Sequence, residues 1–218
     1  MKNFQVAIDG PAGSGKSTIS KMVCDRIGFT HIDTGAMYRA VTLEALNLGV
    51  DLEREESYKF LDDIKIVYND DKIYLNGKPV GREIRSTRVA NNVSTVAKMP
   101  VVRTNMVKLQ QEAAKNGLIL MDGRDIGTVV LPNADLKIFL TASVEERANR
   151  RFKENALSGS QENYDEVLAA IKDRDFKDSN RELNPLRMAE DAVLVDTTNM
   201  NIEQVVEKII NLIKEKFA

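Results

Sequence analysis

The sequence predicts an α/β protein in which a parallel sheet is covered by helices on both faces. Three observations predict this class. A short apolar run at residues 4–8 leads into a glycine-rich loop and then into a helical pattern that ends near residue 27. Short apolar runs then alternate with helical patterns along most of the 218-residue chain. Hydrophobic residues make up 43% of the chain, which is enough to fill a core between such layers.

The elements of the sheet and its helices can be assigned in order from these patterns. Each expected strand is an apolar run of three to five residues, and each expected helix carries apolar residues three or four positions apart. Gly49 follows one helical pattern and Pro100 separates two others, as helix ends require. Strands are expected at residues 4–8, 29–32, 118–121, 136–140 and 193–195, and helices at residues 16–27, 35–48, 85–97, 101–115, 144–156, 164–178 and 202–217. Strands that alternate with helices predict parallel pairing.

Residues 62–83 have a different pattern. Ile64, Ile66 and Tyr68 alternate with polar residues, and the sequences NDD at 69–71 and NGKP at 76–79 are turn signals. This segment is expected to form a small antiparallel sheet in a lobe of its own.

Composition excludes several classes of function. Lys and Arg total 31 against 33 acidic residues, and a net charge of −2 argues against a protein dedicated to nucleic acids or membrane surfaces. The single cysteine, Cys24, excludes an internal disulfide and a cysteine-based zinc site. No apolar stretch approaches a membrane span of about 20 residues, and the first residues do not resemble a signal peptide. A cytoplasmic protein is expected, and His31, the only histidine, is expected to be structural.

The sequence GPAGSGKS at residues 10–17 carries the strongest motif of the chain. It has the spacing GxxxxGK[ST] between an expected strand and an expected helix, which is the context of a phosphate-binding loop. Glycines let the backbone N–H groups converge on an anion, and the helix adds its positive end. Lys16 is expected to reach the β- and γ-phosphates, and the Ser17 hydroxyl to bind Mg²⁺. The residues expected to bind ATP through this loop are Gly10, Pro11, Ala12, Gly13, Ser14, Gly15, Lys16, Ser17 and Thr18.

An enzyme that phosphorylates a small molecule needs a second anion site, and three segments offer one. DTGAMYR at 33–39 opens a helix, and DGRD at 122–125 follows a strand, where open α/β sheets bind ligands. In DGRD, Asp122 is expected to hold Mg²⁺ through water and Arg124 to bind phosphate. In RDFKDSNR at 174–181, a helix would place Arg174, Asp178 and Arg181 on one face.

A further cluster of arginines precedes the polar loop at 157–163. Arg147, Arg150 and Arg151 share one face of an expected helix. This pattern is typical of a lid that closes arginines over the transferring phosphoryl group and excludes water. Arg147 and Arg151 are therefore expected to be catalytic, and Arg150 to bind ATP.

With these pieces identified, the sequence closely resembles the bacterial cytidylate kinases of the nucleoside monophosphate kinase superfamily. The motifs that carry the resemblance run in family order over essentially the whole chain: IDGPAGSGKST, HIDTGAMYRA, REIRSTRVANNVS, MDGRDIGTVVLPNADLKIFL, ERANRRF and RDFKDSNRELNPL. The resemblance implies a three-layer P-loop fold with a core at about 1–34, 98–146 and 164–218. It also implies a monophosphate-binding lobe at about 35–97, with the sheet insertion at 62–83, and a lid at about 147–163.

The resemblance further implies transfer of the γ-phosphoryl group of ATP to CMP or dCMP, with Mg²⁺, by a monomer. Lys16, Arg124, Arg147, Arg151 and Arg181 would be catalytic. By similarity, the acceptor phosphate would be bound by Thr34, Arg39, Arg124 and Arg181, the sugar by Arg174 and Asp178, and the base by Ser94, Arg103 and Asp125. Two alternatives stay open: a kinase of the same superfamily that acts on adenylate, guanylate or shikimate, and a regulator that binds ATP as a signal.

Overall fold

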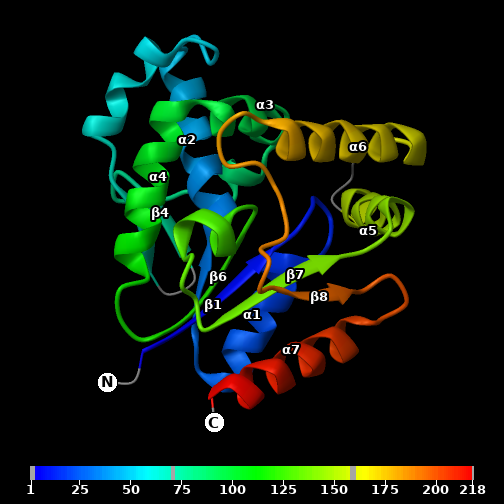
Figure 1. Ribbon diagram of the computed structural model, residues 1–218. Coiled ribbons are helices and arrows are strands. Elements are labelled where there is room, and N and C mark those ends of the chain that lie inside the picture. The colour runs from blue at the N-terminus through cyan, green and yellow to red at the C-terminus, as the bar shows by residue number, and fades with distance from the viewer. Residues whose placement is uncertain (1–2, 70–71, 158–160, 218) are drawn as a thin grey trace. The chain divides into compact units, whose positions relative to one another are not determined.

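The computed structural model describes residues 3–69, 72–157 and 161–217 (Figure 1). The chain divides into two compact units, one of residues 1–31 with 116–218 and the other of residues 32–115. The second unit takes in residues 98–115, which the sequence analysis assigned to the core. None of the helices in the described ranges is long and apolar enough to cross a membrane.

A five-stranded sheet confirms the predicted fold class. Its strand order is β2-β6-β1-β7-β8, and β1 pairs in parallel with both β6 and β7, while β7 pairs in parallel with β8. The strands are β1 (Phe4–Asp9), β2 (Thr30–Asp33), β6 (Leu118–Gly123), β7 (Leu136–Thr141) and β8 (Val193–Asp196). Asp9 lies opposite both Gly123 and Phe139. The residues that follow β1, β6 and β7 therefore leave the sheet on the same side, at the carboxyl ends of these parallel strands.

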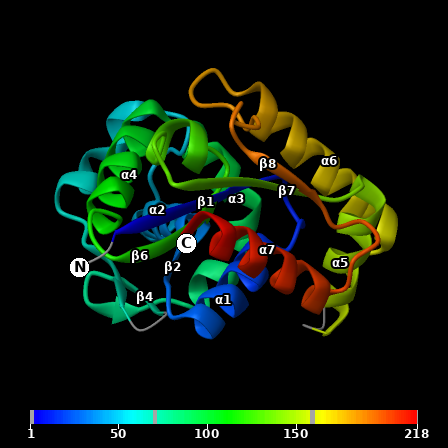
Figure 2. The ribbon, with the colours of Figure 1, turned by 60° about the horizontal axis from the view of Figure 1, so that its bottom comes forward.

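One face of these strands is covered by helices α1 (Lys16–Ile27) and α7 (Ile202–Phe217), as Figure 2 shows. Buried side chains of β1, β7, α1 and α7 form one apolar core there, with Val6, Leu140, Val23 and Ile209 at 0% exposure. At its end, the rings of Phe4 and Phe217 meet edge to face at 5.1 Å between centroids. This core fixes the start of α1, and with it the phosphate loop, on the end of β1.

Helices α5 (Val144–Leu157) and α6 (Tyr164–Asn180) pack against each other in the same unit. Ala148, Val167 and Ile171 form their common core, and the rings of Phe152 and Tyr164 meet edge to face. A capping box between Asn163 and Glu166 fixes the start of α6. Residues 158–160 of the predicted lid lie outside the described residues.

The second unit contains α2 (Thr34–Leu48), α3 (Thr87–Lys98) and α4 (Pro100–Ala113). Its three-stranded antiparallel sheet of β3 (Ile66–Asn69), β4 (Lys72–Leu75) and β5 (Lys78–Pro79) confirms the predicted insertion. Gly49 ends α2 with a left-handed φ of 67°, as expected. Two short 3₁₀ helices, at Glu55–Asp62 and Glu83–Arg85, were not expected from the sequence.

Candidate functional site

The phosphate loop at residues 10–17 needs glycine at two positions where its backbone passes close to the backbone of another segment. A Cβ atom on Gly10 would lie 2.0 Å from the Leu140 carbonyl oxygen, so the loop leaves β1 against the backbone of β7. Gly13 has a φ of 73°, and a Cβ there would meet the Arg147 backbone oxygen at 3.1 Å. Gly15 precedes α1 with a φ of 85°. The glycine spacing of the motif therefore follows from packing and from left-handed backbone.

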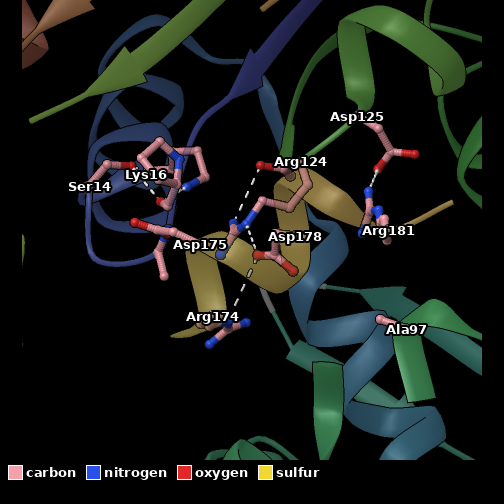
Figure 3. A network of polar contacts seen from close by, with 12 residues as sticks. Ser14, Lys16, Ala97, Arg124, Asp125, Arg174, Asp175, Asp178 and Arg181 are labelled. Carbon is pink, nitrogen blue, oxygen red and sulfur yellow. Dashed lines mark hydrogen bonds and ion pairs between the residues drawn. The ribbon is translucent and has the colours of Figure 1, made fainter. Parts of the chain in front are cut away.

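Lys16 lies inside this loop rather than in solvent (Figure 3). Its Nζ donates hydrogen bonds to the Pro11 carbonyl oxygen at 2.8 Å and to Ser14 Oγ at 3.1 Å. Burial, and next the positive charge of Arg124, lower the pKa of Lys16 well below its ordinary value. The oxygens of Pro11 and Ser14 are neutral, so an anion bound in the loop would supply the negative charge that stabilises the protonated form of Lys16.

Ser17 and Asp122 meet at the start of α1 and the end of β6. Ser17 Oγ donates to Asp122 Oδ2 at 2.9 Å, and Asp122 Oδ1 lies 2.6 Å from His31 Nε2. Asp122 and His31 are both buried. His31 thus orients the carboxylate of Asp122, the residue predicted to hold Mg²⁺ through water. No cluster of three or more His, Cys, Asp or Glu suited to a metal occurs in the described part of the chain. A hydroxyl and a carboxylate are oxygen groups of the kind that Mg²⁺ prefers, so the chemistry of Ser17 and Asp122 fits the predicted ion.

Asp9, the last residue of β1, holds the segment after Arg124. Its two carboxylate oxygens accept hydrogen bonds from the N–H groups of Ile126 and Gly127, both at 2.7 Å. These groups begin a single π-helical turn, Ile126–Val130, that packs on β1 and β6. Burial raises the pKa of Asp9 to about 6, against the opposing effect of the two hydrogen bonds. Asp9 directly precedes the motif GPAGSGKS, but no sequence signal predicted its role.

Charged residues of DGRD and α6 form one network in the first unit, which Figure 3 shows. Arg124 Nε donates to Asp178 Oδ2 at 2.8 Å, and Arg174 Nε lies 4.0 Å from the same oxygen. Just beyond the end of α6, Arg181 Nη2 lies 3.3 Å from Asp125 Oδ1. Burial raises the pKa of Asp178, but the surrounding arginines, Arg124 first, lower it below its ordinary value. The structure thus brings together five of the predicted residues.

The remaining predicted acceptor residues belong to the second unit. Thr34 is buried as the first residue of α2, and Arg39 Nη2 donates to Asp33 Oδ2 at 3.0 Å. Arg39 Nε is buried without a partner in the described ranges, which suits a donor that awaits a ligand. Arg103 is 1% exposed, and its guanidinium carbon lies 5.5 Å from the centre of the Tyr38 ring. Ser94 is half-buried on α3.

The three arginines of α5 lie in different surroundings. Arg147 is buried and donates to the carbonyl oxygens of Ala142 and Ala12, both at 3.0 Å. Arg150 donates to the Thr197 carbonyl oxygen at 2.7 Å, and Arg151 lies 3.2 Å from Glu154 Oε2 on the exposed surface. The predicted phosphoryl roles of these arginines stay predictions. The sequence analysis missed the acidic partner of Arg147, which is Asp175.

Comparisons with known proteins agree with the motifs. A family model described as cytidylate kinase matches residues 6–215. The chain is 52% identical over 214 residues to a cytidylate kinase of Acholeplasma laidlawii, covering 98% of this chain and 96% of the relative. It is 48% identical over 223 residues to one of Leuconostoc mesenteroides, covering 100% of both. Among solved structures, shikimate kinase from Bacteroides thetaiotaomicron is similar in fold, with a TM-score of 0.50, 12% identity and coverage of 97% and 98%.

Proposed function

Because the chain belongs to the cytidylate kinase family, we propose that it transfers the γ-phosphoryl group of ATP to CMP or dCMP, with Mg²⁺, to give the diphosphate. The network of Arg124, Arg174, Arg181, Asp125 and Asp178 carries this proposal. It lies in the same unit as the phosphate loop, so one folded body carries groups suited to a donor and to an acceptor.

The donor is held by the phosphate loop in this proposal. Its N–H groups and the start of α1 bind the phosphates of ATP, as the glycine conformations favour. Lys16 Nζ exchanges Pro11 and Ser14 for the β- and γ-phosphate oxygens. The remaining donor contacts are Thr18, next to Ser17, and Arg150 of α5.

Mg²⁺ is held by Ser17 directly and by Asp122 through water. When bound, the ion neutralises charge that develops on the phosphate oxygens. The hydrogen bond between Ser17 and Asp122 supports this assignment, because it brings the hydroxyl next to the carboxylate. His31 keeps Asp122 in that orientation.

The acceptor is recognised by three groups of residues. Thr34, Arg39, Arg124 and Arg181 bind its phosphate, and Arg174 with Asp178 binds its sugar. Ser94 and Arg103 donate hydrogen bonds to the base, and the Asp125 carboxylate accepts one from the amino group of cytosine. Uracil would turn a carbonyl oxygen toward that carboxylate, so this contact distinguishes the two bases.

The reaction needs alignment and charge neutralisation rather than a covalent intermediate. The acceptor phosphate is already an adequate nucleophile, so no general base is required. Lys16, Arg124 and Arg181 stabilise the charge of the loose transition state, with Arg151 and Arg147 as the predicted lid contributions. We propose that the enzyme acts as a monomer in the cytoplasm, with no nucleic-acid or membrane partner; its elution volume on size-exclusion chromatography tests the monomer.

A panel of acceptors in an ADP-release assay tests the activity. CMP and dCMP should support turnover with ATP and Mg²⁺, whereas UMP, AMP, GMP and shikimate should support far less. Binding of ATP without turnover on any acceptor would favour a regulator and refute the proposal. Preferred turnover of AMP, GMP or shikimate would assign another kinase of the superfamily.

Asp125→Ala tests the base contact. The CMP-to-UMP ratio of kcat/KM should fall by at least about 10²-fold, since loss of a specifying polar contact can cost up to about 10⁴-fold. Asp173→Ala is the matched control, because Asp173 forms an exposed ion pair with Lys177 on α6. An unchanged ratio in a folded Asp125→Ala protein would remove Asp125 from base recognition.

A further inference from the structure

Ala12 of the phosphate loop has both of its backbone polar groups held by one ion pair. Its N–H donates to Asp175 Oδ1 at 3.2 Å, and its carbonyl oxygen accepts from Arg147 Nη1 at 3.0 Å. The same Arg147 nitrogen pairs with Asp175 Oδ2. The peptide groups on either side of Ala12 are therefore held by side chains of the protein itself.

The pair is anchored on two helices of the same unit. Arg147, on α5, also donates from Nε to the Ala142 carbonyl oxygen at 3.0 Å. Its backbone lies close to the next loop residue, since a Cβ on Gly13 would lie 3.1 Å from the Arg147 carbonyl oxygen. Asp175 comes from α6, between Arg174 and Asp178 of the acceptor network, and Figure 3 shows its side chain beside the loop that carries Ser14 and Lys16.

The Arg147–Asp175 pair is much less exposed than the surface charged pairs of α5 and α6. The side chains of Arg147 and Asp175 are 8% and 21% exposed, whereas both partners of the Lys177–Asp173 pair are 59% exposed. A surface pair of that kind contributes little, but a buried, hydrogen-bonded charge is costly to leave without its partner. The Arg147–Asp175 pair is thus able to impose one conformation on the loop.

We propose that Arg147 and Asp175 are positioning residues for the donor nucleotide: together they fix Ala12 so that the N–H groups after it converge on the phosphates. This inference rests on the proposed function, because it takes ATP as the ligand of the loop. The pair also joins the loop to the helix that carries Arg174 and Asp178. In this positioning role, Arg147 acts through its contacts with Ala12 and Asp175.

Asp175→Asn tests the pair with little change of shape. Ala12 and Arg147 donate to different oxygens of the Asp175 carboxylate, and the amide replaces one of these oxygens by an NH₂ group, which must then face one of the two donors. We expect the Kd of ATP, measured by titration calorimetry without an acceptor, to rise about tenfold, as loss of one charge-assisted hydrogen bond implies. The Kd of CMP should stay within about twofold. Asp173→Asn on the same helix should leave both values unchanged.

Arg147→Lys provides a second variant, and it carries the test if Asp175→Asn does not fold. A lysine keeps the charge but has one nitrogen, so it cannot replace both Nε, which donates to Ala142, and Nη1, which contacts Ala12 and Asp175. The Kd of ATP should therefore rise by a smaller factor. Equal weakening of ATP and CMP, or a Kd of ATP within twofold of the parent in a folded variant, would overturn the inference. A parent protein that binds ATP but does not phosphorylate CMP would refute the proposed function instead, and the comparison of ATP affinities would still decide the role of the pair.

Discussion

Replacement of Asp9 by asparagine should change how the stability of the protein depends on pH. The Asp9 carboxylate is 4% exposed, and burial raises its pKa from an ordinary 3.8 to about 6. Between these two pH values the folded protein binds more protons at Asp9 than the unfolded chain does. The contribution of Asp9 to stability is therefore fully present below pH 3.8 and is lost as the pH rises through about 6.

The size of this effect follows from the two pKa values. A difference of about 2.2 pKa units at about 1.36 kcal/mol each amounts to about 3 kcal/mol over the whole range. Most of it, about 2 kcal/mol, falls between pH 4.5 and pH 7.5. Over that interval, the free energy of unfolding of the parent should fall by about 2 kcal/mol relative to that of Asp9→Asn, which has no charge to bury.

Urea denaturation of both proteins at several pH values measures the difference. The same series in 0.5 M NaCl is the control, because salt screens distant charges but leaves the cost of burying Asp9 in place. A parent-to-variant difference that stays constant within about 0.5 kcal/mol from pH 4.5 to pH 7.5 would refute the reasoning. So would a difference that moves in the opposite direction.

Three further substitutions test the site and its scaffold. Lys16→Ala should lower kcat at saturating substrates by at least about 10²-fold, and a variant that keeps most of its kcat would refute the role of Lys16. Asp178→Asn should lower the free energy of unfolding at pH 7 by roughly 3 kcal/mol, because it removes the buried negative charge that faces Arg124 and Arg174; parent and variant should converge as the pH falls through the lowered pKa of Asp178. Gly10→Ala should lower the melting temperature far more than Gly28→Ala, since a Cβ meets the Leu140 backbone at 2.0 Å in the first case and open space in the second; equal losses would contradict this.

The fold was predictable from the sequence because its signals are local. Each strand of the large sheet is a short apolar run, and the helices begin and end within a few residues of the expected positions. The phosphate loop was equally predictable, because the motif itself fixes where glycine must adopt positive φ. The π-helical turn Ile126–Val130 was not predictable, since IGTVV looks like any apolar run. Its N–H groups are held by Asp9, 117 residues away from Ile126.

The same limit applies to the candidate site. Arg124, Arg174 and Asp178 were identified by type and spacing, and the structure places them within one network. Asp175 was missed because it is one of several charges in RDFKDSNR, and only its contact with Ala12, 163 residues earlier, distinguishes it. The phosphoryl role of Arg147 stays a prediction, and sequence spacing could not show that its guanidinium also donates to Ala142 and Ala12.

The packing of α5 on α6 also determines how far each part of these helices would move if the lid closed. Phe152 and Tyr164 lock the far parts of the two helices together, while Arg147 and Asp175 pin the near end to Ala12. From Arg147 to Leu157 the helix rises about 15 Å, so a rotation of about 15° about the pinned end would carry the tip about 4 Å. Arg151 lies closer to the pinned end and would move less than the tip of the helix. Closure by this route would rotate α5 and α6 as one rigid body about their contact with the phosphate loop.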